Sequence, residues 1–299
     1  MQEKLRGIII PAITPFDDSD EFSAQMLTEN YEKWNRTDVR GYMALGSNGE
    51  YRMLDDNESL DVVKAAASAR DPKKTLIVGV GRESLHQTLH FIDRVEDLDA
   101  GIDYVSVLVP HYFAGLMTDR TVINYYTAIA DHAKLPVLLY CAPSFANGVT
   151  ISAEAVRILA DHPNILGIKD TSKNMMDAYM DAAGGREDFD IMAGSVSNLI
   201  RCYERGGAGG VVSAANYLPQ ECADIYNAFQ SDGIEAAAAA CSSVQALARK
   251  TGARGSVAGV KCTMNLLGYA GGNPRKPLLP VDPETEAEYA AALREAGKL

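Results

Sequence analysis

The feature that most constrains the fold is a set of short apolar runs that recur along nearly the whole chain. Each run is rich in Ile, Val, Leu and Gly, and successive runs begin roughly 30 residues apart, the length of one strand–helix unit. The eight candidate strands are residues 7–13, 41–46, 75–81, 104–110, 136–143, 165–170, 189–195 and 209–216. Continuous apolar runs of this kind are typical of a parallel sheet whose two faces are both covered by helices.

Helical patterns lie between these runs, and several begin with a residue that favours the start of a helix. Ser23, Ser84 and Ser152 are expected N-caps, and Asp55 with Glu58 is expected to form a capping box. Eight alternating units favour a closed (β/α)8 TIM barrel, with a doubly wound open sheet as the alternative. We expect the barrel to occupy residues 1–230 and to end with a helix near residues 219–230.

The chain after residue 230 is mostly helical in pattern. A helix is expected near residues 234–250, where the alanine-rich stretch 236–240 favours helix strongly. The glycine-rich turn at 271–274 and the proline-bounded stretch 277–283 are expected to form a loop. We therefore expect residues 231–299 to be a C-terminal helical extension packed on the barrel.

Charge and cysteine content exclude several classes of function. The formal net charge of -12 argues against a nucleic-acid or anionic-membrane partner, since both need a basic surface. No stretch approaches the ~20 apolar residues of a membrane span. The five cysteines are far apart and form no Cys-x-x-Cys pair, which indicates reduced thiols and no zinc site. We expect a cytoplasmic protein.

Active sites of such barrels form at the carboxyl ends of the strands, so we expect the catalytic and substrate-binding residues there. The candidates are Thr14, Ser47, Asn48, Tyr112, Tyr140, Lys169 and Gly194.

Lys169 is the most informative of these candidates because an apolar strand ends in an amine. An unprotonated lysine so placed can form a Schiff base with a 2-oxo acid, whereas a solvated lysine at a strand end is the ordinary alternative. Tyr140 ends the preceding run, so its phenol would lie beside the amine and shuttle protons; a core tyrosine bonded to backbone is the alternative. Lys261 is the rival lysine, but its place in the helical extension favours a solvated or ion-paired role.

Ser47 and Asn48 lie in the sequence Gly-Ser-Asn-Gly-Glu at residues 46–50. Two glycines around a hydroxyl and an amide favour an anion-binding turn, with an ordinary glycine-rich turn as the alternative. The segment lacks the ending of a P-loop and a dinucleotide fingerprint, which argues against a nucleotide. His86 and His90 lack the intervening Glu of a zinc motif, and no Gly-x-Ser-x-Gly elbow is present. We expect no metal and no hydrolase chemistry.

Three motifs taken together resemble the dihydrodipicolinate synthase / N-acetylneuraminate lyase family, and the likeness covers nearly the whole chain. They are Gly-Ser-Asn-Gly-Glu at 46–50, Leu-Tyr-Cys-Ala-Pro at 139–143 and Gly-Ile-Lys-Asp-Thr at 167–171. Shorter matches are Thr-Pro-Phe at 14–16, Ala-Gly-Ser at 193–195, Gly-Gly-Val at 209–211 and the glycines near residues 268–272. The first motif looks most like the 4-hydroxy-2-oxoglutarate aldolase branch.

The resemblance implies a class I pyruvate-dependent lyase that works through a covalent imine. Lys169 would bond to the keto carbon of pyruvate or another 2-oxo acid, Tyr140 would act as acid and base, and Ser47 with Asn48 would hold the carboxylate. The residues expected around the same substrate are Thr14, Gly194 and Val211. No metal or organic cofactor is implied.

The resemblance also implies an assembly. Tyr112 would reach across a subunit contact into a neighbouring site and join Ser47 in a proton relay. The expected assembly is a homotetramer built as a dimer of dimers.

Two departures from the family pattern bear on the substrate. Phe145 follows Pro143 and Ser144, where dihydrodipicolinate synthases usually carry an arginine that binds the aldehyde's carboxylate, and Asn48 replaces a threonine. We therefore predict cleavage or condensation of a pyruvate unit with an aldehyde, as in 4-hydroxy-2-oxoglutarate or 2-keto-3-deoxy sugar acids. The alternatives are a dihydrodipicolinate synthase using pyruvate and aspartate semialdehyde, a sugar-acid dehydratase, and a keto-acid-binding sensor without turnover.

Overall fold

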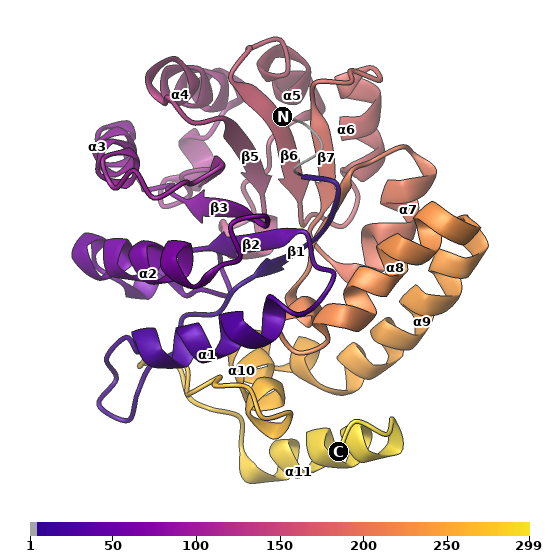
Figure 1. Cartoon of the computed structure of the whole chain (residues 1–299). Helices are drawn as coiled ribbons and strands as arrows, with labels where there is room; N and C mark the ends of the chain where they lie inside the picture. The colour runs from indigo at the N-terminus through magenta and orange to yellow at the C-terminus, as the bar shows by residue number, and fades with distance from the viewer. Residues whose placement is uncertain (1–4) are drawn as a thin grey trace.

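The chain folds into a closed barrel of eight parallel strands, as seen in a computed structural model that describes residues 5–299 (Figure 1). Each strand pairs with the next, and β1 pairs with β8 to close the cylinder. The strands are β1 Gly7–Pro11, β2 Gly41–Ala44, β3 Thr75–Gly79, β4 Tyr104–Leu108, β5 Val137–Cys141, β6 Ile165–Asp170, β7 Asp190–Ala193 and β8 Gly209–Val211. The predicted TIM barrel is confirmed, and the doubly wound alternative is wrong.

All eight predicted strands are present, but seven of them end earlier than the apolar runs do. Only β6 has the predicted bounds. The run that begins at Gly7 continues through Ala12 and Ile13, which are buried although they lie beyond the ladder of β1. The last run overshoots most, because Ser213–Asn216 is a 3-10 turn rather than strand. Loops at the carboxyl end of the barrel are therefore apolar and buried, so hydrophobicity alone does not mark where each strand ends.

Helices surround the barrel on its outside (Figure 1). They are α1 Ala24–Trp34, α2 Asp56–Ala69, α3 Leu85–Glu96, α4 Asp119–His132, α5 Ala153–Leu159, α6 Met176–Ala183, α7 Leu199–Glu204 and α8 Pro219–Asp232. Ser23, Ser84 and Ser152 cap their helices as predicted. Only one half of the predicted capping box at α2 is present. Asp55 accepts from two backbone N–H groups, but the Glu58 carboxylate binds Arg275 instead of the N–H of Asp55.

Three further helices follow the barrel: α9 Ile234–Lys250, α10 Ser256–Leu266 and α11 Pro283–Glu295. In Figure 1, α9 lies along α8, and α10 and α11 lie beyond α1 at the end of the chain. The helix expected near residues 234–250 is α9, and the expected loop lies between α10 and α11. The part of the chain that the structure describes holds no helix both long and apolar enough to span a bilayer.

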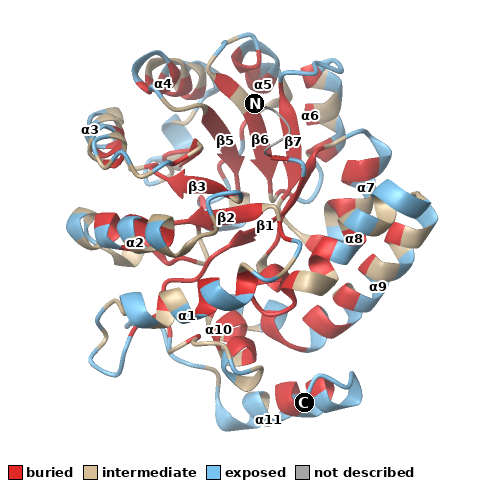
Figure 2. Ribbon diagram, viewed as in Figure 1, coloured by how far each residue is buried: buried red, intermediate tan, exposed pale blue. Residues whose placement is uncertain are grey.

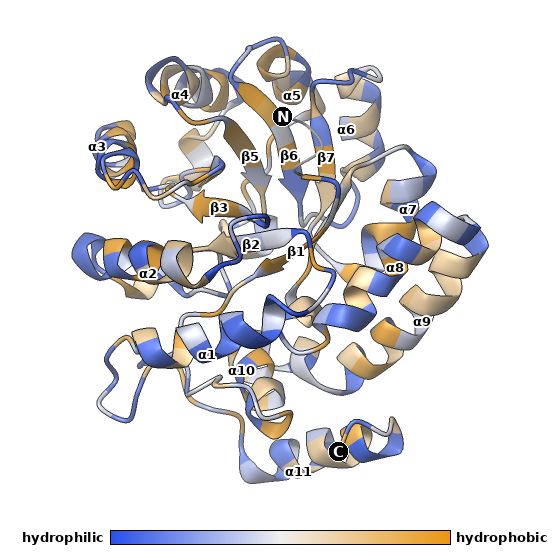
Figure 3. Ribbon diagram, in the orientation of Figure 1, coloured by the Kyte–Doolittle hydropathy of each residue, from blue (hydrophilic) through white to orange (hydrophobic). Residues whose placement is uncertain are grey.

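The core consists of the strands and the inner faces of the helices (Figure 2). Colouring by hydropathy shows the same division, with the polar residues of the helices on the outside (Figure 3). Burial of this apolar surface is the main force that holds the layers together.

Asn216 closes the seam between the first and last strands. Its side-chain oxygen accepts from the N–H of Ile13 at 3.1 Å, and its amide donates to the carbonyl oxygens of Pro11 at 3.0 Å and Ser213 at 3.1 Å. Its own carbonyl oxygen accepts from the indole N–H of Trp34 at 3.0 Å. One buried amide thus continues the joint between β1 and β8 beyond the ladder.

Candidate active site

Lys169 and Tyr140 lie side by side on adjacent strands. They are register partners of β6 and β5, and the Lys169 Nζ lies 4.2 Å from the centroid of the Tyr140 ring. The lysine side chain is only 6% exposed, and its Nζ lies 3.9 Å from the sulfur of Met43. No carboxylate among residues 5–299 forms an ion pair with it. The amine therefore packs against an aromatic face and forms no ion pair with a described carboxylate.

Ser47 brings the loop after β2 to the same place. Its hydroxyl oxygen lies 3.2 Å from the phenolic oxygen of Tyr140, within hydrogen-bond distance. Asn48 donates to the Ser213 hydroxyl at 2.8 Å, and Thr14 donates to the carbonyl oxygen of Gly49 at 2.7 Å. The turn at residues 46–50 is thus fixed by loops that follow β1 and β8.

Glu50 anchors this turn to helix α10. It has a left-handed backbone (φ 52°), and its Oε1 lies 2.6 Å from the Nζ of Lys261 on α10. Lys261 also donates to the carbonyl oxygen of Asn273 at 2.9 Å, and burial lowers its pKa to about 8 although Glu50 opposes that shift. Because Lys261 is 0% exposed, the predicted ion-paired role is confirmed and the solvated one is wrong.

Arg275 is a part of this anchor that the sequence did not reveal. Its backbone N–H donates to the Glu50 Oε2 at 2.8 Å, and its guanidinium binds the Glu58 carboxylate and stacks over Phe16, 4.1 Å from the ring centroid. The contact with Glu50 joins positions 225 residues apart, so no short motif could have indicated it. Helix α10 and the loop after it therefore hold the loop that carries Ser47.

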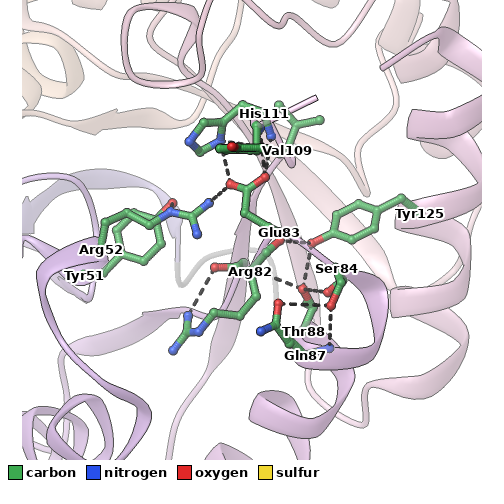
Figure 4. A network of polar contacts seen from close by, with 12 residues as sticks. Tyr51, Arg52, Arg82, Glu83, Ser84, Gln87, Thr88, Val109, His111 and Tyr125 are labelled. Carbon is green, nitrogen blue, oxygen red and sulfur yellow. Dashed lines mark hydrogen bonds and ion pairs between the residues drawn. The ribbon is translucent and has the colours of Figure 1, made fainter. Parts of the chain in front are cut away.

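Tyr112 is not brought to Ser47 within this chain. Its side chain is 75% exposed and packs edge-on against Phe113, with 5.0 Å between ring centroids. The backbone N–H groups of Tyr112 and His111 donate to Glu83 at 2.9 Å and 3.0 Å. Figure 4 shows this carboxylate between Arg52 and His111. Glu83, which sequence reasoning missed, thus shapes the loop that presents Tyr112 to the outside.

The pKa of Glu83 shows how firmly this loop is held. Partial burial by itself acts to raise that pKa, but the two backbone donors, Arg52 and His111 together hold it below its usual value. The carboxylate is thus stabilised in its charged form, which accepts hydrogen bonds most strongly.

The remaining predicted residues lie on neighbouring strand ends. Gly194 follows β7, and a Cβ added there would lie 2.0 Å from the Thr171 hydroxyl and 2.8 Å from the Asp170 carbonyl oxygen, so only glycine fits. Val211 is buried on β8. Burial raises the pKa of Asp170, although its Oδ1 accepts from the N–H of Ser172 at 2.8 Å. The segment after Lys169 is therefore packed tightly against the loop after β7.

Two neighbouring cavities open beside these residues. The larger, of about 490 Å³, is lined by Asn48, Thr171 and Gly194 at the strand ends and extends to α9. The smaller, of about 180 Å³, is lined by Ser47, Asn48 and Tyr51. Asn48 and Phe145 line both. Three of the predicted substrate-binding residues, Ser47, Asn48 and Gly194, thus lie beside enough open space for a small organic acid, whereas Thr14 and Val211 do not line these cavities.

Metal ligands do not gather in this region. Over residues 5–299 no group of three or more His, Cys, Asp and Glu side chains is placed to hold a metal ion. His86 and His90 are exposed on α3.

Known proteins resemble this chain over nearly its whole length. The chain matches the dihydrodipicolinate synthetase family over residues 4–296. A probable mitochondrial 4-hydroxy-2-oxoglutarate aldolase of Emericella nidulans is 29% identical over 97% of this chain and 93% of its own length. A 4-hydroxy-tetrahydrodipicolinate synthase of Ligilactobacillus salivarius is 28% identical over 96% of this chain and 97% of its own.

Solved structures show the same fold. Dihydrodipicolinate synthase of Thermotoga maritima superposes with a TM-score of 0.91 at 23% identity, covering 98% of this chain and 99% of that one. A prophage protein of E. coli K12 from the dihydrodipicolinic acid synthase family, solved in complex with pyruvate, gives a TM-score of 0.89 at 22% identity, covering 98% of this chain and 99% of that one. With the family match spanning nearly its whole length, the chain belongs to the dihydrodipicolinate synthetase family of pyruvate-dependent lyases.

Proposed function

We propose that this protein is a class I aldolase that forms an imine between Lys169 and a 2-oxo acid. The observation that carries the proposal is the position of the Lys169 amine against the Tyr140 ring, with the Tyr140 hydroxyl 3.2 Å from that of Ser47. An amine, a phenol and a hydroxyl in contact form the set that imine chemistry needs, a nucleophile with a proton donor and acceptor beside it.

The proposed chemistry balances with these groups alone. Lys169 adds to the keto carbon, and Tyr140 protonates the departing hydroxyl so that water leaves and an iminium remains. The Tyr140 phenolate then takes the proton of the substrate's C4 hydroxyl, the C3–C4 bond breaks, and its electron pair moves into the iminium to give an enamine and a free aldehyde. Protonation at C3 and hydrolysis release pyruvate and restore the amine. Condensation is the same sequence in reverse.

The other predicted residues are proposed to bind the substrate. Backbone and side-chain donors of Ser47 and Asn48 would hold the carboxylate next to the imine, as an anion-binding turn does. The residues proposed to surround the same substrate are Thr14, Gly194 and Val211. We propose no metal or organic cofactor, because the lysine itself supplies the electron sink once it is an iminium.

The proposal also covers how the subunits assemble and where the protein is located. We propose a homotetramer, a dimer of dimers, in which Tyr112 of one subunit completes the relay of its neighbour, because Tyr112 is exposed here and does not reach its own Ser47. We propose a cytoplasmic location because all five cysteines are free thiols.

Among aldehydes, we favour those of 4-hydroxy-2-oxoglutarate and 2-keto-3-deoxy sugar acids. Phe145, 48% exposed, lines both cavities at the place where dihydrodipicolinate synthases carry an arginine. An apolar ring there cannot form the charge-assisted bonds that a carboxylate needs. Binding of the aspartate semialdehyde carboxylate by this loop, in the manner of dihydrodipicolinate synthases, is therefore disfavoured. A keto-acid sensor is also disfavoured, because it has no use for a phenol beside the amine. Dehydration of a sugar acid would use the same residues.

Borohydride reduction with pyruvate tests the mechanism. We expect peptide mass spectrometry to find the reduced pyruvate adduct on Lys169 of the native protein and none in Lys169→Ala. Lys173→Ala, which changes an exposed lysine in the following loop, is the matched control and is expected to label normally. A native protein without the adduct, or with the adduct on another lysine, would disprove the mechanism.

A further inference from the structure

The larger cavity lies between α9 and the loops beside the proposed imine site. Its wall includes Asn48, Thr171 and Gly194 at the strand ends, and on the other side Gln245 and Arg249 of α9. Lys169 does not line this cavity itself, but Thr171 lies two residues after it and Gly194 on the neighbouring strand end. The cavity therefore offers space beside the proposed imine for the remote part of a substrate, and α9 forms its far wall.

The lining of this cavity carries no negative charge. Although the whole chain has a net charge of -12, none of the described residues that line the cavity is Asp or Glu. Hydroxyl groups are frequent there instead: Thr171, Ser195, Ser197, Ser213 and Ser256. Such a lining suits a hydroxylated and anionic ligand, because it offers many hydrogen bonds and no repulsion.

The three arginines that line the two cavities differ in their partners. Arg52 forms an ion pair with Glu83, and Arg254 forms one with Glu288. Arg249 has no carboxylate partner within residues 5–299; its NH2 group lies 3.4 Å from the side-chain oxygen of Gln245. Of the three arginines, Arg249 is thus the one whose positive charge is not balanced by a carboxylate of the described residues.

Gln245 gives the guanidinium a fixed neighbour. Its amide nitrogen lies 3.4 Å from the carbonyl oxygen of Val196, in the loop after β7. This leaves the amide oxygen facing Arg249, and one contact with a neutral acceptor uses only part of the five N–H donors of an arginine. The remaining donors match the two oxygens of a carboxylate.

We propose that Arg249 binds a second, terminal carboxylate of the substrate, at the end remote from the imine carbon. This inference rests on the proposed function and narrows its substrate class to 2-oxo acids with a hydroxylated chain and two carboxylates. Arg249 thus replaces, from α9, the charge that Phe145 does not supply from the loop after β5.

Condensation of pyruvate with matched aldehydes tests the inference. The pairs are glyoxylate with glycolaldehyde and succinic semialdehyde with 4-hydroxybutanal, each a carboxylate against a neutral hydroxyl at the same chain length. The longer pair is included because the cavity reaches α9. We expect the native enzyme to prefer a carboxylate and Arg249→Gln to lose roughly ten- to hundredfold in kcat/KM for that aldehyde only, the range for a hydrogen bond to a charged group. Arg249→Lys should restore part of the loss.

Arg254→Gln is the control. It removes an arginine from the same cavity, but the charge of Arg254 is already balanced by its ion pair with Glu288. It should leave the preference unchanged. An equal loss for charged and neutral aldehydes in Arg249→Gln, or a native enzyme without preference, would overturn the role of Arg249 while pyruvate still labels Lys169. If pyruvate does not label Lys169 in the native enzyme, the proposed function fails and this inference fails with it.

Discussion

At the scale of single residues, Tyr140 links the proposed nucleophile to the loop that is proposed to bind the carboxylate. Its ring contacts the Lys169 amine, and its hydroxyl contacts that of Ser47. Tyr140→Phe keeps the ring and removes only the proton-transferring oxygen. We expect kcat to fall by about 10²- to 10⁴-fold, the usual contribution of a general acid or base. Steady-state cleavage of 4-hydroxy-2-oxoglutarate is the measurement. Tyr269→Phe is the control, because the Tyr269 ring packs beside that of Trp34, with 6.3 Å between the ring centroids. A loss below tenfold in Tyr140→Phe would refute the proposed role.

Asp190, the first residue of β7, predicts a pH-dependent stability. Burial raises its pKa to about 6 against the opposing charge of Arg6, and its Oδ2 has no hydrogen-bond partner among the described residues. The folded state therefore holds this proton more tightly than the unfolded state, so the stability it contributes is complete below the ordinary pKa of 3.8 and is lost as the pH rises through about 6.

Asp190→Asn removes this penalty. We expect the free energy of unfolding at pH 8 to rise by about 1–3 kcal/mol, since one pKa unit corresponds to about 1.4 kcal/mol, and the gain to vanish near pH 4. Urea denaturation at pH 4, 6 and 8 is the measurement. A gain that is the same at every pH would show that the effect comes from packing and not from ionisation.

At the scale of elements, α10 and the loop after β2 form one unit through Lys261 and Glu50. Lys261→Met leaves a buried carboxylate without its cation and should cost about 3–5 kcal/mol of unfolding free energy. The double variant Lys261→Met with Glu50→Gln removes both charges and should be the more stable of the two. Denaturant unfolding of both variants checks this, and equal stabilities would mean that the pair is not coupled.

The sequence predicted the elements better than it predicted their ends and their long-range contacts. Local signals sufficed for eight strands and for the caps at Ser23, Ser84 and Ser152. Strand ends were overestimated because the loops at the barrel mouth are as apolar and buried as the strands, as Ala12 and Ile13 show. The bonds of Arg275 to Glu50 and Glu58 join residues more than two hundred positions apart, and only the folded barrel brings them together.

The proposed site was predictable for a different reason. Tyr140 and Lys169 each lie one residue before the end of a strand, and consecutive strands of a barrel are neighbours, so topology alone placed them together. Tyr112 shows the limit of this reasoning. Its position depends on a loop held by Glu83, and its proposed partner lies on another subunit.

At the scale of the whole molecule, the exposed loop with Tyr112, Phe113 and Leu116 is the surface on which the proposed assembly depends. These side chains are 75%, 64% and 66% exposed, and adjacent apolar groups of this kind mark contact surfaces. Phe113→Asp should weaken the contact between subunits and lower kcat, because Tyr112 would no longer reach a neighbouring site. Analytical ultracentrifugation with an activity assay is the measurement. Leu279→Asp, an exposed apolar residue in the loop before α11, is the control; a variant of Phe113 that keeps both size and activity would exclude this interface.

The hydrogen bonds of Asn216 to the end of β1 also bear on how the chain folds while it is being synthesised. Since β1 pairs with β8 and Asn216 bonds to Pro11 and Ile13, the first strand keeps an open edge until more than two thirds of the polypeptide has left the ribosome. An unpaired edge invites pairing with other chains, and contacts between distant segments form slowly. Nascent chains halted before residue 209 should therefore depend on chaperones more than full-length chains do.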